Sequence, residues 1–138
     1  MEKITVFIGW AEKNYSAYTD DFERLGGVVV ATGKTLEAVK KEFQSALLFH
    51  IEGCKEDGDN IAEWLLSGQY EIEYTLETSA LLHNFDGIIT RAAIARATGI
   101  NERQIGHYAS GIRNPRPMQR KRIVAGLHKI SRELASVV

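Results

Sequence analysis

The chain has 138 residues, of which 44% are hydrophobic and 25% charged, as is normal for a soluble globular protein. It contains no apolar run of about eighteen residues, which excludes a transmembrane helix. The net charge of −1 hides an asymmetry, because residues 1–78 carry 15 Asp and Glu against 7 Lys and Arg, whereas residues 79–138 carry 3 against 10. Net charges of opposite sign predict two modules with different partners, and the basic module is a candidate for phosphate contact.

The N-terminal residues and the cysteine content indicate a cytoplasmic protein. The first apolar run, ITVFIGW, alternates and has no small-residue cleavage site, so it predicts a first strand and not a signal peptide. The single Cys54 cannot form an internal disulfide, which fits a reducing compartment.

Residues 1–78 are expected to form a β-β-β-α-β module in which a helix covers one face of a sheet. The third strand is a continuous apolar run, typical of a strand buried on both faces, and the fourth alternates apolar and acidic residues. Thr35 is the expected N-cap of the helix. A turn is expected at 24–27, before the third strand. A polar, glycine-containing loop is expected after the helix, followed by one helical turn within 61–68. The predicted strands are 3–10, 14–19, 27–32 and 70–77, and the helix is 36–52.

Residues 79–138 contain only helical patterns, predicted at 79–85, 91–98, 102–110 and 117–136. Thr90 and Asn101 are expected N-caps, and Gln104 stands at the spacing of a capping box with Asn101. Pro117 suits a first helical turn.

The second and third of these helices have the residue types of a DNA-reading helix pair. Gly99 suits a tight turn that needs positive φ, and Gly111 suits a helix end. Small residues would allow a close helix crossing, and apolar residues would hold it: Ala92, Ala93, Ala95, Ile94, Ile100, Ile105 and Tyr108.

The stretch TRAAIARATGINERQIGHYASGIRNPRP, followed by RIVAGL, resembles the Xre/Cro-type helix-turn-helix, including its Gly-x-x-x-Pro segment at Gly111 to Pro115. The resemblance implies that Glu102, Arg103 and His107 face the major groove, and that basic residues outside this helix touch phosphate. Gln104 suits either a base contact or the capping box, and we favour the capping box. The candidate DNA-binding residues are Arg91, Asn101, Glu102, Arg103, Gln104, His107, Arg113 and Arg116.

The first module resembles the HicB family of bacterial antitoxins. The likeness lies in YSAYTDDFERLGGVVVATGKTLEAVKKEFQSALLFHIEG and in the helix start formed by Gly33, Thr35, Leu36, Glu37 and Ala38. The sequence departs from the family at Leu25-Gly26-Gly27, where a Pro-Gly-Cys-like segment is usual.

The HicB resemblance implies a partly degraded ribonuclease-H-like fold without catalysis. It also implies that this module binds and blocks a HicA-type toxin, a small basic protein that cleaves mRNA. The helical module would then repress the toxin–antitoxin operon by binding operator DNA. A net charge of −8 in the first module suits a basic partner.

Other functions remain open on sequence alone. An orphan transcription regulator could use the first module to dimerise or to sense a ligand. A metal-dependent nuclease would need converging carboxylates, and Asp20, Asp21 and Glu23 cluster on an expected loop, whereas the first strand has none. His50 and Cys54 lack further nearby ligands for zinc. RNA binding by the sheet is disfavoured by the negative charge.

The sequence therefore predicts an α+β protein with a HicB-like toxin-binding domain at residues 1–78 and an all-α helix-turn-helix domain at residues 79–138. We expect a non-enzymatic, cytoplasmic antitoxin and repressor without cofactor or metal. Its expected partners are double-stranded operator DNA, a HicA-like toxin and further copies of itself in a dimer or tetramer, with no membrane.

Overall fold

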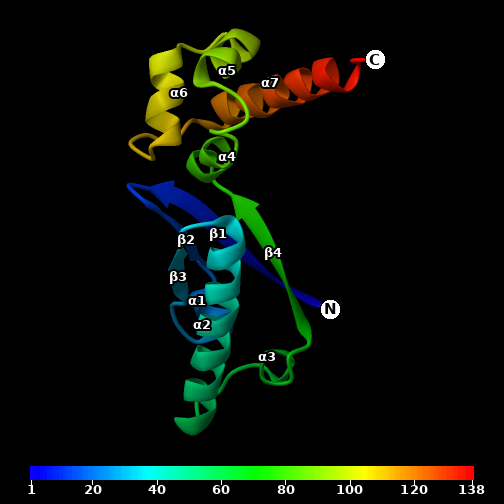
Figure 1. The fold of residues 1–138 in the computed structure, drawn as a ribbon. Coiled ribbons are helices and arrows are strands. Elements are labelled where there is room, and N and C mark those ends of the chain that lie inside the picture. Colours follow the sequence, from blue (N-terminus) through cyan, green and yellow to red (C-terminus); the bar gives the residue numbers. More distant parts are fainter. The chain divides into compact units, whose positions relative to one another are not determined.

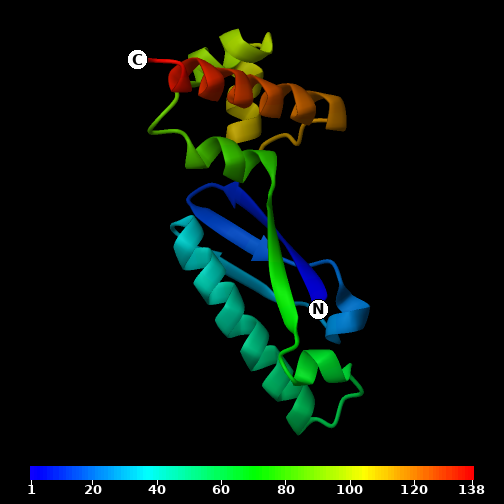
Figure 2. The same cartoon turned by 90° about the vertical axis from the view of Figure 1, so that its right-hand side faces the viewer.

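The computed structural model describes residues 1–138, which form two compact units, Met1–Glu77 (unit 1) and Thr78–Val138 (unit 2). The fold is mixed α+β, with one four-stranded sheet and seven helices (Figures 1 and 2). None of the helices combines the length and apolar character needed to cross a bilayer. The elements are β1 (Glu2–Ala11), β2 (Asn14–Tyr18), α1 (Phe22–Leu25), β3 (Val30–Gly33), α2 (Leu36–Glu56), α3 (Glu63–Leu66), β4 (Tyr70–Leu76), α4 (Thr78–Asn84), α5 (Arg91–Thr98), α6 (Glu102–Ala109) and α7 (Pro117–Ala135).

The sheet of unit 1 has the strand order β3-β2-β1-β4. The neighbouring strands β1, β2 and β3 pair antiparallel, whereas β4 returns after α2 and α3 to pair parallel with β1. Helix α2 lies over one face of the sheet (Figure 1). The β1 side chains that alternate toward this face, Ile4, Val6 and Ile8, are fully buried. The expected β-β-β-α-β order is therefore confirmed, and α3 is the helical turn expected within 61–68, whereas the one-turn helix α1 is additional.

Helix α2 begins where its N-cap was expected and ends later than expected. The Thr35 hydroxyl oxygen accepts a hydrogen bond from the Ala38 amide at 3.0 Å. The helix continues to Glu56, four residues beyond the predicted end, and stops before Gly58, which has a φ of +69°. The buried side chains Ile51 and Cys54 extend the apolar face into this last part, so packing outweighs the polar composition that predicted a loop.

The third strand lies at the edge of the sheet, and the prediction that it is buried on both faces is wrong. Strand β3 pairs with β2 alone. Val29 is buried, but the side chains of Val28 and Val30 are 63% and 61% exposed. An apolar run indicates strand tendency but not strand order, which depends here on where the other strands pair.

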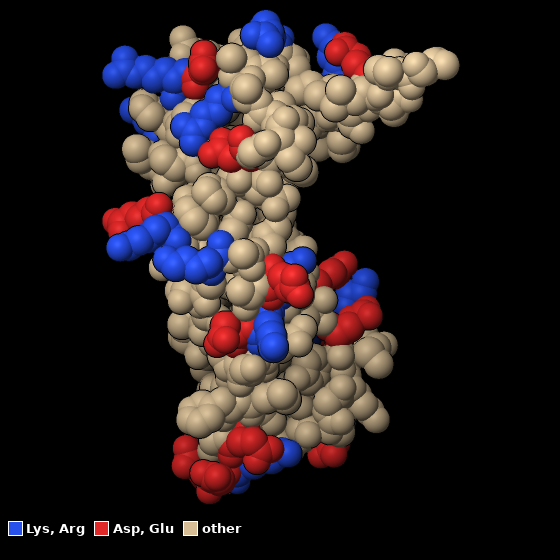
Figure 3. All heavy atoms as spheres, viewed as in Figure 1, with Lys and Arg blue, Asp and Glu red and all other residues tan.

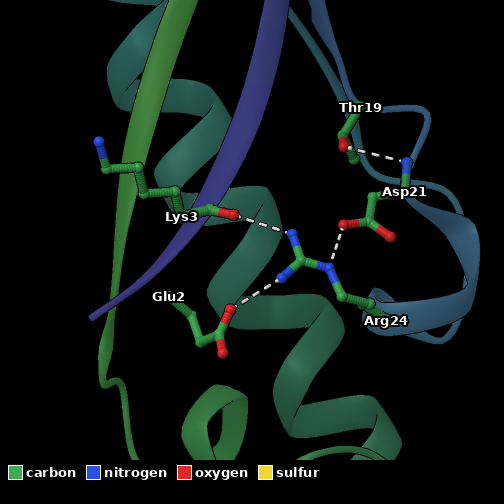
Figure 4. A network of polar contacts seen from close by, with 5 residues as sticks. All are labelled: Glu2, Lys3, Thr19, Asp21 and Arg24. Carbon is green, nitrogen blue, oxygen red and sulfur yellow. Dashed lines mark hydrogen bonds and ion pairs between the residues drawn. The ribbon is translucent and has the colours of Figure 1, made fainter.

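Residues 22–25 form the short helix α1 rather than only a turn, and Arg24 joins it to two other elements. The Arg24 guanidinium donates to the Asp21 carboxylate at 2.5 Å, to the Glu2 carboxylate at 3.1 Å and to the Lys3 carbonyl oxygen at 2.8 Å (Figure 4). The same guanidinium lies 5.1 Å from the ring centroid of Trp64, in α3. Because the ion pairs are partly exposed, their main effect is to position β1, α1 and α3 and not to add much stability.

Unit 2 consists of four helices around one apolar core. Helix α6 contributes three buried residues to this core, Ile105, Tyr108 and Ala109. The tightest helix contact lies between Gly126 of α7 and α5, where an added Cβ would approach the Thr98 side chain to 2.4 Å and Ala97 to about 3.5 Å. Pro117 is the first residue of α7, as expected. The remaining buried core residues are Leu82, Ile94, Ile100 and Ile123.

The close approach of β3 to α2 depends on Gly33. We predict that Gly33→Ala lowers the free energy of unfolding of unit 1 by about 1–3 kcal/mol, because the new Cβ would lie 2.6 Å from the Val39 amide nitrogen. Gly53→Ala is the matched control, since its Cβ meets no atom within 4 Å and it should stabilise α2 by about 0.5–1 kcal/mol. Urea unfolding followed by tryptophan fluorescence measures unit 1 alone, because Trp10 and Trp64 both lie there. Equal stabilities of the two variants would contradict the prediction.

Candidate nucleic-acid interface

The α5–α6 pair is held by a connection of three residues with different roles. Gly99 takes a left-handed φ of +73° and its amide donates to the Ala95 carbonyl oxygen at 2.8 Å, which ends α5. The side chain of Ile100 is buried in the core of unit 2. Asn101 then caps α6. Because each residue has a separate constraint, the direction in which α6 leaves α5 is closely defined.

Asn101 is the N-cap of α6 as expected, but the expected capping box with Gln104 is wrong. The Asn101 side-chain oxygen accepts from the Arg103 amide at 2.8 Å. Instead of reaching back to residue 101, the Gln104 amide donates to the Tyr108 hydroxyl at 2.9 Å. The hydroxyl of the buried Tyr108, one turn ahead, offers Gln104 an acceptor that the local sequence pattern does not reveal.

Four of the predicted site residues gather around one shallow depression on unit 2. Arg91 comes from the start of α5, and Glu102, Arg103 and His107 come from α6. Gly106 and Ser110 complete its lining. The i, i+4 spacing of Arg103 and His107 puts them on one helix face, while Arg91 approaches that face from a different element.

Gly106 and Ser110 were not among the predicted site residues. An added Cβ on Gly106 would lie 3.5 Å from a terminal nitrogen of Arg91, which is an ordinary van der Waals contact, so the Arg91 guanidinium lies beside α6 here without requiring the glycine. A glycine inside a helix costs about 1 kcal/mol relative to alanine, and this cost was the one sign in the sequence that Gly106 could border a site. Arg91 also forms an ion pair with Asp86 at 3.5 Å, which holds its side chain near the depression.

His107 has one ring nitrogen turned away from solvent. Its Nδ1 atom is buried and has no hydrogen-bond partner within the protein. The other ring nitrogen, Nε2, is therefore the polar atom with which this side chain can meet an external group in the depression.

The remaining basic residues divide into exposed and inward-turned groups. Arg113 and Arg116 are exposed in the segment between α6 and α7, outside the depression. Arg120 donates to the Thr78 hydroxyl at 3.0 Å, and burial lowers the pKa of its guanidinium. Arg122 donates to the Thr98 carbonyl oxygen at 2.9 Å, at the end of α5. Residues 113–122 are the densest basic stretch of the sequence, and two of their arginines are thus engaged in contacts within unit 2.

Charge is unevenly distributed over the surface. Figure 3 shows Lys and Arg side chains around α6, and Asp and Glu side chains around the last turns of α2. Unit 2 as a whole has 10 Arg and Lys against 3 Asp and Glu. The depression therefore lies in a unit whose field attracts anions.

The polar clusters of unit 1 have partners within the fold. Asp21 pairs with Arg24, and no group of three or more His, Cys, Asp or Glu side chains is arranged to hold a metal ion. The His50 Nε2 atom lies 2.6 Å from the Leu25 carbonyl oxygen and 3.6 Å from the Cys54 sulfur. Burial, with the nearby Asp59 carboxylate, raises the pKa of the Cys54 thiol.

Comparison with known proteins does not place the chain in a family. No protein-family model, curated protein or solved structure matches it. The chemistry of the candidate interface therefore rests on its own residues and geometry.

The cap of α6 should be measurable separately from ligand binding. We predict that Asn101→Ala destabilises α6 by about 0.5–2 kcal/mol, because the Arg103 amide loses its acceptor. Asn114→Ala, in the exposed segment after α6, should change stability by less than about 0.5 kcal/mol. Hydrogen exchange of the α6 amides, followed by NMR, makes the comparison. Unchanged protection in Asn101→Ala would show that the cap contributes nothing.

Proposed function

We propose that this protein is an antitoxin and autorepressor whose unit 2 binds operator DNA. The observation that carries the proposal is the gathering of Arg91, Glu102, Arg103 and His107 around one depression in a basic unit. Together with the Xre/Cro-like sequence pattern, this arrangement supports α6 as the helix that enters the major groove. A groove about 12 Å wide admits one helix with its side chains.

The exposed residues at the start of α6 supply groups that can read base edges. The Arg103 guanidinium can donate two hydrogen bonds to the O6 and N7 atoms of guanine, and the Glu102 carboxylate can accept from a cytosine amine. Nε2 of His107 supplies a third polar contact. Asn101 and Gln104 act mainly on the protein itself in this proposal, because their side chains already bind Arg103 and Tyr108.

The arginines away from the start of α6 are assigned to phosphate. Arg91 can exchange its exposed ion pair with Asp86 for a phosphate, while Arg113 and Arg116 are exposed on the segment that follows α6. Phosphate contacts set the register of the protein on the duplex without selecting sequence. Two copies would read half-sites about 34–36 Å apart, so the active form is at least a dimer.

Unit 1 is proposed to bind a small basic ribonuclease of the HicA type. Its 15 Asp and Glu against 7 Lys and Arg would steer such a partner and compete with RNA for the same basic surface. The HicB-like sequence pattern and the sheet-plus-helix architecture support this assignment. The action is steric, so the chain itself is proposed to be non-enzymatic and cytoplasmic, without a cofactor.

Two arginines separate sequence reading from phosphate contact. Arg103→Ala should cost about 1–3 kcal/mol on DNA from the chain's own upstream region and relax preference at one base pair, whereas Arg113→Ala should weaken cognate and random DNA alike. Arg132→Ala, an exposed arginine near the end of α7, is the matched control and should leave affinity nearly unchanged. Fluorescence anisotropy with labelled duplexes at several salt concentrations measures all three. Equal losses for Arg103→Ala on cognate and random duplexes would refute base reading by α6.

The toxin-binding role is tested by co-expression with the small basic protein encoded by the adjacent gene. We expect growth rescue and co-purification, with the dissociation constant rising several-fold between about 50 and 200 mM salt because opposite charges meet. DNA binding without rescue or complex formation would instead favour an orphan regulator, in which unit 1 only dimerises or senses a ligand.

A further inference from the structure

The two edges of the sheet in unit 1 differ in charge. Strand β4 forms one edge and exposes Glu71 and Glu73, the second of which pairs with Lys3 at 3.8 Å. Strand β3 forms the other edge, and residues 25–33 contain no charged side chain. Charged residues on an edge strand hinder the addition of another strand. The β4 edge therefore has this protection, and the β3 edge lacks it.

Apolar side chains border the β3 edge on both sides. Val28, just before the strand, and Val30, its first residue, are largely exposed, and Phe49 of α2 is 82% exposed. Beside them is a hollow of about 380 Å³ that is lined by this strand segment and by α2, including Phe49 itself and Gly53, and also by the carboxylates of Asp57 and Asp59, which follow α2. An added Cβ on Gly53 would meet nothing within 4 Å, so this part of the helix surface is open. A protruding aromatic ring and a hollow thus lie on the same surface.

We infer that the free edge of β3, together with the neighbouring flank of α2, is an interface between two copies of this chain. The two β3 strands would pair antiparallel about a two-fold axis, which joins the two sheets into one. The same rotation lays the two α2 helices side by side and antiparallel, so that Phe49 of each copy faces the hollow of the other. A two-fold interface requires such a self-complementary patch.

Charge favours a second copy as the occupant of this edge. Unit 1 has a net charge of −8, so two copies repel wherever their carboxylates meet, and the stretch 25–33 offers an approach without them. From the segment that leads into α2 to the segment that follows it, the charge also changes sign: residues 34–41 carry three Lys and one Glu, and residues 52–59 carry four acidic residues and one Lys. Antiparallel helices place the basic beginning of one opposite the acidic end of the other.

A basic protein would gain little from the strand itself, because residues 25–33 carry no charge and the only carboxylates that line the hollow are those of Asp57 and Asp59. The inferred interface is also independent of DNA and of a toxin, so its test succeeds or fails without either. The proposed function already requires at least a dimer. The inference adds that unit 1 forms one of the contacts between copies, independently of any contact that unit 2 forms.

The first experiment is cross-linking of the full chain with a short bismaleimide, without DNA. Val28→Cys, Val30→Cys and Thr32→Cys place a thiol along the β3 edge, and Thr75→Cys places one on the exposed face of β4 as the matched control. Cys54 is buried, so the unsubstituted chain gives the background. We expect covalent dimers from the β3 positions, strongest for the residue nearest the two-fold axis, and background from Thr75→Cys. Yields at β3 no higher than at Thr75→Cys would overturn the inference.

The second experiment measures self-association by sedimentation equilibrium. Val30→Lys puts like charges opposite each other across the inferred ladder and should weaken one association step by about tenfold or more, while Thr75→Lys should leave every step unchanged. Circular dichroism verifies that both variants are folded, and the cysteine variants decide the outcome if Val30→Lys is not. A folded Val30→Lys chain that associates like the wild type overturns the inference. If that chain has also lost binding to the adjacent gene's product, the β3 edge is a binding site for that protein and not an interface between copies.

Discussion

The connection between α5 and α6 is the constraint on which the candidate interface depends. Its three residues form the turn between the helices, contribute one side chain to the core and cap the start of the next helix. Gly99 supplies the left-handed backbone, Ile100 the buried side chain and Asn101 the cap. A different backbone path through these residues would shift α6 relative to α5 and disturb the depression that Arg91 and Arg103 line together. The proposed DNA contact thus depends on backbone geometry before it depends on charge.

Charge sets the partners that each unit can accept, but a count of basic residues overstates what is available to a ligand. Arg120 and Arg122 are engaged with Thr78 and with the end of α5. The Arg122 guanidinium satisfies a backbone carbonyl oxygen that the end of α5 leaves without an intrahelical partner. The positive field of unit 2 still includes both charges, and it acts over about a Debye length of 8–10 Å at ordinary salt. Directional contacts, in contrast, are left to the residues that border the depression.

In unit 1, a helix layer covers only one face of the sheet, so two edges and the other face are exposed to solvent. Glutamates on β4 make one edge hydrophilic, and Tyr18 on the uncovered face donates to Glu77 at 2.8 Å. Partial burial, followed by this hydrogen bond and the carboxylate charge, raises the pKa of Tyr18 to about 12. The β3 edge has no charged side chains, because residues 25–33 contain none. That contrast within one sheet is why the inferred contact between copies is assigned to β3.

Local patterns in the sequence determined most elements of this protein. The Thr35, Thr90 and Asn101 caps, the alternation in β4 and the glycine at position 99 depend on neighbouring residues, and such interactions are visible within a few positions of the chain. Only the tertiary structure decided that β3 lies at an edge, that Gln104 turns to Tyr108, and that Arg91 lies beside Gly106. Each of these depends on a strand, a hydroxyl or a guanidinium that folding brings close, and the hydrophobic pattern of a segment does not encode which neighbour it meets.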